Sequence, residues 1–277
     1  MQANPPNYSF IHLRKRAYQC LCLTDPAQKV AEVHQLEHII KNQTYVLDTQ
    51  ECIQEEEHLI PGRPKKPDLV NPLLVKRRAM HTNEGRAIAI HALAHIEFNA
   101  INLALDAVWR FANMPKEYYL DWLKVASEEA KHFLLLNNHL SDLDFNYGDF
   151  PAHDSLWEMV EKTKTDVIAR MALVPRTMEA RGLDAVPMIR NRFEQIKDKK
   201  MVDILDTILH DEIGHVEVGN RWFHYLCEVH QLDSIETFQK LSIQYRAPTL
   251  RGPFNLTARK LAGFTDTELD LLIQQAN

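Results

Sequence analysis

Two Glu-x-x-His pairs in this 277-residue chain have the spacing of metal ligands. Glu129 with His132, and Glu212 with His215, fall in stretches where apolar residues recur every three or four positions. Residues three apart on an α-helix project from the same face, so both side chains of a pair can bind one ion. Because the apolar residues share that face, we expect both pairs to point into a helical core.

Two further glutamates, Glu97 and Glu179, stand alone within apolar helical patterns. An unpaired carboxylate in a core is strongly destabilising, so both of them require partners. A third Glu-x-x-His pair, Glu55 with His58, belongs to a charged run beside several prolines. We interpret that third pair as solvent-facing surface.

The order along the chain is Glu, Glu-x-x-His, Glu, Glu-x-x-His, with one of these features in each of four predicted helices. Glu97 precedes Glu129 by 32 positions, and Glu179 precedes Glu212 by 33. From His132 to Glu179 the separation is 47 positions, as expected of two antiparallel helix pairs joined by a longer crossover. Four carboxylates and two imidazoles are the ligand set of a two-metal site in a four-helix bundle. The alternative is a bundle in which these charges pair with one another without metal.

The composition predicts an all-α protein that carries this site in a soluble, cytoplasmic setting. Glycine is scarce, with 8 residues, and alternating β-branched residues are nearly absent. A formal net charge of −6 argues against a general nucleic-acid or membrane-surface binder. No uninterrupted apolar run reaches the length of a membrane span, and the N-terminus does not resemble a secretory signal. The four cysteines follow no disulfide or zinc pattern, so we expect reduced thiols.

The predicted helices divide the chain into three parts. Residues 1–80 hold N-terminal helices and a proline-rich connector, 81–230 hold the four-helix bundle, and 231–277 form a helical extension. Gly182 is expected to end the third long helix, and Thr265 with Glu268 forms a capping box for the last one. The helices are expected over residues 26–41, 83–113, 116–140, 155–181, 187–198, 201–230 and 233–243, followed by the last one.

Three residues around Glu179 are notable. Pro175 removes one backbone N–H from the third long helix and is expected to bend it. Arg176 and Arg181 flank Glu179 and could either bind an anionic substrate or pair with acids, and we favour pairing. We interpret His91 and His95, on the helix of Glu97, as core histidines with satisfied hydrogen bonds.

Over residues 83–230 the pattern resembles the ferritin-like diiron-carboxylate superfamily. Phrases such as "EGRAIAIHALAHIE", "YGDFPAHDSLW" and "RMALVPRTMEARGLD" are similar, more specifically, to the bacterial branch catalogued as domain of unknown function 455. That likeness spans nearly the whole chain. It implies a ferritin-like four-helix bundle with additional N-terminal and C-terminal helices.

The resemblance also implies a ligand set. Glu97, Glu129 and His132 would bind one metal ion, and Glu179, Glu212 and His215 the other, with Glu129 and Glu212 as bridges. Iron suits such a site, with manganese as the alternative, and O₂ or peroxide would be the co-substrate. Glu128 and Asp211 resemble the acids that hydrogen-bond ligand histidines in this superfamily, although both could instead face solvent.

The sequence is compatible with four functions. The first is an O₂- or peroxide-dependent hydroxylase or oxidase acting on a small molecule, with an electron-donor protein and a monomeric or small oligomeric state. The second is a ferroxidase or another iron-handling protein. The third is an RNA-modifying enzyme similar to a tRNA hydroxylase, although nucleic-acid binding has little support. A non-catalytic helical bundle is the fourth. The only support for RNA is a basic cluster formed by Arg63, Lys65, Lys66, Lys76, Arg77 and Arg78.

Overall fold

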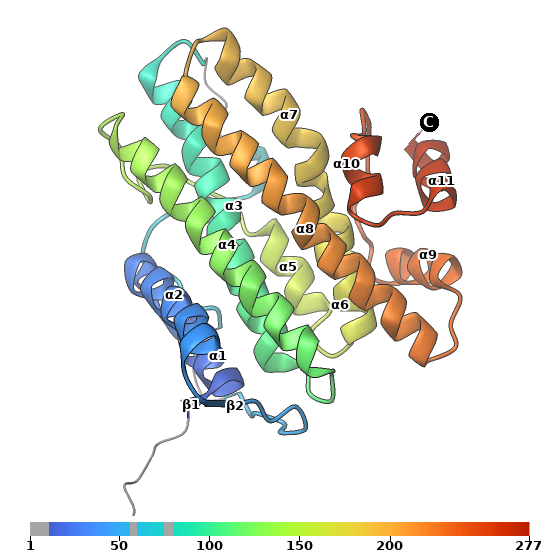
Figure 1. Ribbon diagram of the computed structural model, residues 1–277. Coiled ribbons are helices and arrows are strands. Elements are labelled where there is room, and N and C mark those ends of the chain that lie inside the picture. Colours follow the sequence, from blue (N-terminus) through green and yellow to red (C-terminus); the bar gives the residue numbers. More distant parts are fainter. Residues whose placement is uncertain (1–10, 56–59, 75–79, 277) are drawn as a thin grey trace, which may run out of the picture.

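The computed structural model describes residues 11–55, 60–74 and 80–276, and over them the chain is an all-α helical bundle, as predicted. The centre is formed by α3 (Asn83–Arg110), α4 (Lys116–Ser141), α8 (Lys199–Val229) and a fourth helical column that is broken into pieces (Figure 1). α3 packs on α4, the fourth column packs on α8, and α4 packs on α8. Strand structure among the described residues amounts to a short parallel pair, Ile11–His12 (β1) with Tyr45–Val46 (β2), and one isolated bridge.

The fourth column differs from the single helix predicted over residues 155–181. It consists of α5 (Ser155–Lys162), α6 (Val167–Leu173), a π-helical segment η2 (Val174–Glu179) and α7 (Ala180–Gln195). The break falls at residues 163–166, where Asp166 caps α6 by accepting a hydrogen bond from the backbone N–H of Ala169. Gly182 lies inside α7, so the prediction that it ends a helix was wrong. The separate helix predicted over 187–198 is the second half of α7.

Pro175 changes the helix type and does not end the helix. It stands at the start of η2, whose hydrogen bonds reach five residues instead of four. A proline lacks the N–H for the ordinary ladder, and the wider turn accommodates that gap. The π-helical turn ends at Glu179, so it sets the direction in which that carboxylate leaves the helix.

Shorter helices cover both sides of the bundle (Figure 1). α1 (Leu13–Cys22) packs on α3, and α2 (Pro26–Asn42) packs on α4. On the other side, α9 (Ser234–Gln244) packs on α6 and α8, and α10 (Leu256–Leu261) packs on α7 and α8. α11 (Asp266–Ala276) packs on α10 and begins at the predicted capping box, in which Thr265 and Glu268 exchange hydrogen bonds. A 3₁₀ turn, η1 (Pro72–Leu74), lies in the connector, and no disulfide joins the four cysteines.

Buried ionic contacts fix α3 against its neighbours. Asp106 of α3 is fully buried and pairs with Arg170 of α6 and with Arg110 one turn along α3. At the end of α3, the buried Arg14 of α1 donates hydrogen bonds to the carbonyl oxygens of Val108 and Trp109. A cation at a helix C-terminus compensates the partial negative charge of the free carbonyls.

α3 is also the most apolar helix of the bundle. One 18-residue window of α3 has a mean hydropathy of 1.4, so by length and composition the helix could cross a membrane. Within the bundle, however, 78% of that window is buried. Packing in the core therefore accounts for its apolar character.

The contact between η2 and α8 is tight enough to need a glycine. A Cβ atom on Gly219 of α8 would lie 2.5 Å from Cβ of Pro175, well inside the contact distance of two carbon atoms. Gly214, five residues earlier on the same helix, has open space at the corresponding position. Substitutions at these two glycines can therefore distinguish the effect of close packing on stability from the effect of helix propensity.

We expect Gly219→Ala to lower the free energy of unfolding by about 1–3 kcal/mol, because the added methyl group pushes Pro175 away from α8. Gly214→Ala is the matched control and should raise it by roughly 0.5–1 kcal/mol, since alanine favours the helix. Urea denaturation followed by circular dichroism measures both values. Equal effects of the two substitutions would contradict the close approach.

Candidate metal centre

The structure brings both Glu-x-x-His pairs together at the interface of α4 and α8. Glu129 lies at the centre, with one carboxylate oxygen toward each imidazole: Oε1 is 2.9 Å from Nδ1 of His215, and Oε2 is 3.4 Å from Nδ1 of His132. Glu97 of α3 approaches from one side, with Oε2 at 3.5 Å from Nδ1 of His132. Glu212 has its Oε1 at 3.6 Å from Nδ1 of His215. Ligand atoms of Glu97, Glu129, His132 and Glu212 all lie within 4.8 Å of one another.

Glu179 approaches the same cluster from η2. Both of its carboxylate oxygens are buried without a hydrogen-bond partner. Burial raises its pKa well above the usual range, and the nearby charges of Glu129 and Glu212 raise it further. Five of the six residues predicted from spacing are joined by the contacts above, and Glu179 shares a cavity wall with Glu97 and Glu212.

The buried polar atoms of this cluster remain without hydrogen bonds. They are Oε2 of Glu97, both carboxylate oxygens of Glu129 and Glu179, and Nδ1 of His132 and His215. The Nδ1 atoms lie close to carboxylate oxygens, but no N–H points along these short contacts. Buried polar atoms almost always have a partner. A set of converging atoms without one fits metal ions bound between them.

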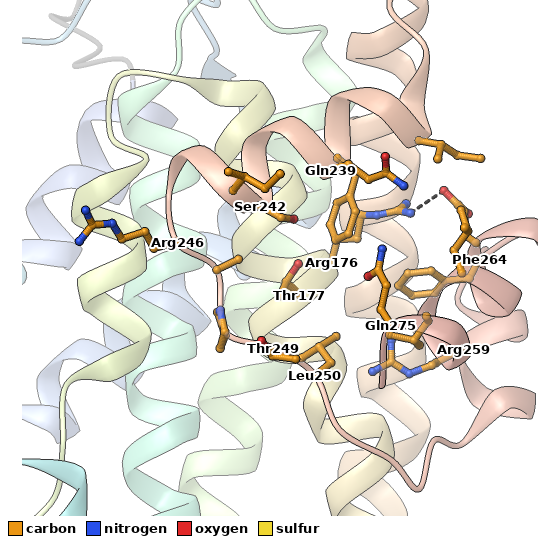
Figure 2. A pocket seen from close by; sticks show the side chains of 18 residues that line it. Arg176, Thr177, Gln239, Ser242, Arg246, Thr249, Leu250, Arg259, Phe264 and Gln275 are labelled. Atoms are coloured by element: carbon orange, nitrogen blue, oxygen red, sulfur yellow. Dashed lines mark hydrogen bonds and ion pairs between the residues drawn. The ribbon is translucent and has the colours of Figure 1, made fainter. Parts of the chain in front are cut away.

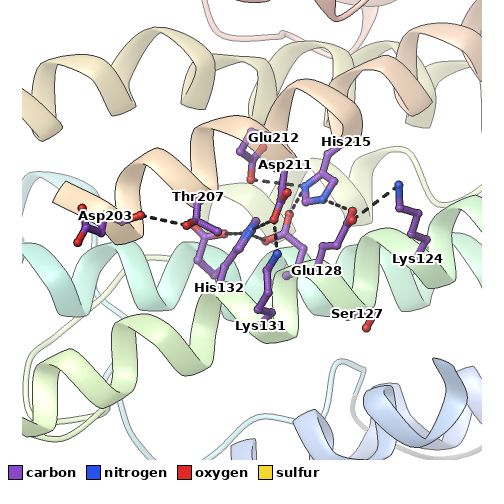
Figure 3. A network of polar contacts seen from close by, with 12 residues as sticks. Lys124, Ser127, Glu128, Lys131, His132, Asp203, Thr207, Asp211, Glu212 and His215 are labelled. Atoms are coloured by element: carbon purple, nitrogen blue, oxygen red, sulfur yellow. Dashed lines mark hydrogen bonds and ion pairs between the residues drawn. The ribbon is translucent and has the colours of Figure 1, made fainter. Parts of the chain in front are cut away.

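The other nitrogen of each imidazole is hydrogen-bonded to an acid outside the cluster (Figure 3). His132 Nε2 donates to Asp211 at 2.9 Å, and His215 Nε2 donates to Glu128 at 3.1 Å. A carboxylate only accepts, so these bonds keep a proton on Nε2 and leave Nδ1 as the nitrogen that would bind an ion. Glu128 precedes Glu129 in the chain but is hydrogen-bonded to His215, and Asp211 precedes Glu212 but is hydrogen-bonded to His132. Each acid therefore orients the histidine of the other Glu-x-x-His pair.

Lysines neutralise the outer side of these acids. Lys131 pairs with Asp211, and Lys124 lies 3.7 Å from Glu128 (Figure 3). The side chains of both lysines are largely exposed. Nothing in the sequence pattern distinguished them from ordinary surface lysines, because their role depends on the register of α4 against α8.

The protonation of the metal-free cluster follows from burial and crowding. Burial, and then the charge of Glu129, raise the pKa of Glu97 and of Glu212. For Glu129 itself burial acts in the same direction, but the imidazoles of His215 and His132 outweigh it and lower the pKa. Burial would lower the pKa of His132, whereas the hydrogen bond to Asp211 and the close carboxylate of Glu129 raise it to about 11. Cations that bind here therefore displace protons.

A cavity of about 530 Å³ reaches the cluster from one side. Three of the carboxylates, on Glu97, Glu179 and Glu212, line it, whereas Glu129 and the two imidazoles do not. Most of the other wall residues are apolar, and a segment of the C-terminal extension, residues 248–254, closes part of it. The apolar wall residues include Leu93, Ile96, Leu156, Met178, Val186, Ile189, Ile208 and Phe254.

The two core histidines and the two arginines discussed above lie outside the cluster of candidate ligands. His91 accepts a hydrogen bond from the backbone N–H of Gly148, and His95 Nδ1 is bonded to the hydroxyl of Tyr147. Burial lowers the pKa of both histidines to about 4, so they are neutral core residues. Arg176 pairs with Glu268, whereas Arg181 is exposed beside the cavity.

Some of the remaining predictions concern residues outside the described part of the chain. His58 lies there, as do Lys76, Arg77 and Arg78. The described members of the basic cluster include Arg63, which pairs with Asp154, and Lys66, which pairs with Asp68.

The fold and the site define an all-α bundle protein with a buried cluster of glutamates and histidines able to hold metal. The chain belongs to the family described as "Protein of unknown function (DUF455)", whose model matches residues 22–270. It is also similar to a protein of Haemophilus influenzae whose printed name is "Uncharacterized protein". The two are 50% identical over 222 residues, which cover 78% of this chain and 77% of the relative. No solved structure matches the chain.

Glu97→Gln should stabilise the metal-free protein at pH 7 by about 1–3 kcal/mol, because it removes a buried carboxylate that has no hydrogen-bond partner at Oε2. The raised pKa of Glu97 means that the folded state binds more protons than the unfolded state above pH 4.5, the unperturbed value. The native glutamate therefore costs stability as the pH rises above 4.5, and the gain from glutamine should disappear below that pH. Urea denaturation in chelator at pH 7 and pH 4 measures this.

The control for that experiment is Glu217→Gln on α8, whose side chain is partly exposed and pairs with Arg221. A surface ion pair contributes about 0–1 kcal/mol, so little change is expected at either pH. A loss of stability in Glu97→Gln at pH 7 would show that Glu97 has a stabilising partner within the protein.

Proposed function

We propose that this chain is a dinuclear metal-carboxylate protein of the ferritin-like diiron type, and that it acts as an O₂- or peroxide-dependent oxidoreductase on a small organic substrate. The observation that carries the proposal is the convergence of buried carboxylate and Nδ1 atoms that have no hydrogen-bond partner. The donor set contains oxygen and nitrogen without sulfur, which suits iron, or alternatively manganese.

The resemblance to the superfamily divides the ligands between two ions. Glu97, Glu129 and His132 would hold one ion, and Glu179, Glu212 and His215 would hold the other. Glu129 turns one oxygen toward each imidazole, as a bridging carboxylate does. Glu212 is assigned as the second bridge on the resemblance alone.

When bound, such ions supply Lewis acidity and one-electron redox chemistry. The chain itself orients the ligand histidines, excludes water from the site and admits the substrate. Asp211 and Glu128 hold the imidazoles in one tautomer, and the apolar walls of the cavity exclude water from the organic molecule. The C-terminal extension, proposed as a separate unit from residue 231, supplies the cavity segment 248–254.

An organic substrate is favoured over iron storage because a cavity of about 530 Å³ adjoins three of the proposed ligands. Pockets of roughly 300–1,000 Å³ suit small-molecule ligands. RNA modification has less support, since Arg63 and Lys66 of the basic cluster are already paired with acids. A cytoplasmic location and an electron-donor protein complete the proposal.

Metal analysis tests the centre directly. Protein purified from iron-replete cells should contain close to two ions per chain, and binding should raise the melting temperature, since a ligand that binds the folded state stabilises it. Glu129→Ala and Glu212→Ala should lose most of the metal, whereas Glu217→Ala, on the same helix as Glu212, should retain it. Wild-type protein that holds no metal under these conditions would refute the proposal.

The outer acids offer a second test. Asp211→Ala and Glu128→Ala leave the proposed ligands in place but free the imidazole N–H that each acid orients. Loss of such a partner typically weakens metal affinity by about 10–100-fold. Competition with a metal-binding dye measures that affinity. Unchanged affinity in both variants would show that these acids do not tune the site.

The oligomeric mass separates the oxidoreductase from the iron-handling alternative. A monomer or small oligomer is expected, because a substrate cavity needs no enclosed shell. Light scattering on the metal-loaded protein gives the mass. A large hollow assembly would favour iron storage instead.

A further inference from the structure

A second cavity, of about 500 Å³, is bordered by η2 and by helices of the C-terminal extension (Figure 2). Its walls come from η2, α9, the connecting segment 246–250 and the last two helices. Arg176 and Thr177 of η2 border this cavity, whereas the next two residues, Met178 and Glu179, border the metal cavity. The two spaces are therefore separated by one turn of π-helix, and residues 248–250 line both.

Arg176 is the main polar group of this second cavity, and its side chain is only 3% exposed. The guanidinium carbon lies 4.9 Å, 5.0 Å and 4.8 Å from the ring centroids of Phe223, Phe238 and Phe264. One terminal nitrogen donates to Asn220 and the other to Glu268. The group is thus held rigidly between aromatic rings and two acceptors.

One nitrogen atom of this guanidinium has no hydrogen-bond partner. Nε of Arg176 is buried and has no hydrogen-bond partner, and neither has the buried hydroxyl of Ser242 on α9. Both residues line the cavity. A buried donor without an acceptor destabilises the fold, so the pair indicates that an acceptor from outside the chain belongs here.

The balance of charge in the cavity is positive. Three arginines line it, Arg176, Arg246 and Arg259, against one acid, Glu268. Arg259 is engaged by Asp184, while Arg246 is exposed at the edge. The remaining walls are mainly apolar and include Ile235, Phe238, Ile243, Leu250, Phe264, Leu271 and Leu272.

We propose that this cavity binds a small amphipathic carboxylate, whose two oxygens accept from Arg176 Nε and Ser242 Oγ and whose hydrocarbon part packs against α9 and α11. Two free donors match a carboxylate better than a phosphate group, which offers more acceptor oxygens than this site can satisfy. Charge-assisted bonds of this kind are stronger than neutral ones. The site is independent of the proposed metal chemistry, because none of the proposed metal ligands lines this cavity.

Isothermal titration of the full-length protein with octanoate tests the site, with octan-1-ol and octylamine as neutral and cationic comparisons. Octanoate should bind with a stoichiometry of one, and octanol should bind about tenfold or more weakly, because it lacks the charge that Arg176 recognises. Octylamine should show no saturable binding. Equal binding of octanoate and octanol, or no saturable binding of octanoate, would overturn the proposal.

Variants then locate the site. Ser242→Leu removes the hydroxyl and fills the cavity without touching the pair of Arg176 and Glu268, so it should weaken octanoate binding about tenfold or more. Ile243→Trp obstructs the same cavity from a position that is 80% exposed, which protects the result against misfolding of the first variant. Met188→Trp is the matched control, because Met188 is 46% exposed and lines only the metal cavity. Binding that survives the first two substitutions but is lost in the control would place octanoate in the metal cavity and refute the proposal.

Discussion

The buried carboxylate of Glu129 contacts two imidazoles, and the arrangement of the bundle depends on keeping it there. Its oxygens are buried, so the charge has to be balanced by groups that other helices bring. His132 comes from the same helix, but His215 comes from α8, which fixes how the two helices lie against each other. A shift by one turn of either helix would separate Glu129 from His215 and both outer acids from their histidines.

The positions of two other carboxylates, those of Glu97 and Glu179, depend on contacts made elsewhere on the helices that carry them. Glu97 is carried by α3, whose position depends on the buried contact of Asp106 with Arg170. Glu179 is carried by η2, whose distance from α8 depends on Gly219 facing Pro175. Both supports lie away from the carboxylates that they position. Substitutions at these supports can therefore alter the site without touching any proposed ligand.

Much of this could be predicted from the sequence, because periodic apolar residues around a Glu-x-x-His pair already place it inside a helical core. The helices of α3, α4 and α8 and the meeting of six residues follow from the same reasoning. The break before Asp166 could not be predicted, and Pro175 predicted a bend but not the helix type, since the π-helical turn packs against α8 at Gly219 and no local pattern contains that contact. The crossed pairing of Asp211 and Glu128 also depends on the register of two helices, which no local pattern contains.

The cavity reaches the candidate metal centre from one side, so it defines the path by which an ion could enter. Glu97, Glu179 and Glu212 stand at the cavity wall, with Glu129 and the imidazoles behind them. Under the proposed function, an ion that came through the cavity would meet these three carboxylates first, and an organic molecule bound there afterwards would block its return. Occupancy of the cavity would then slow the exchange of ions with the surrounding solution.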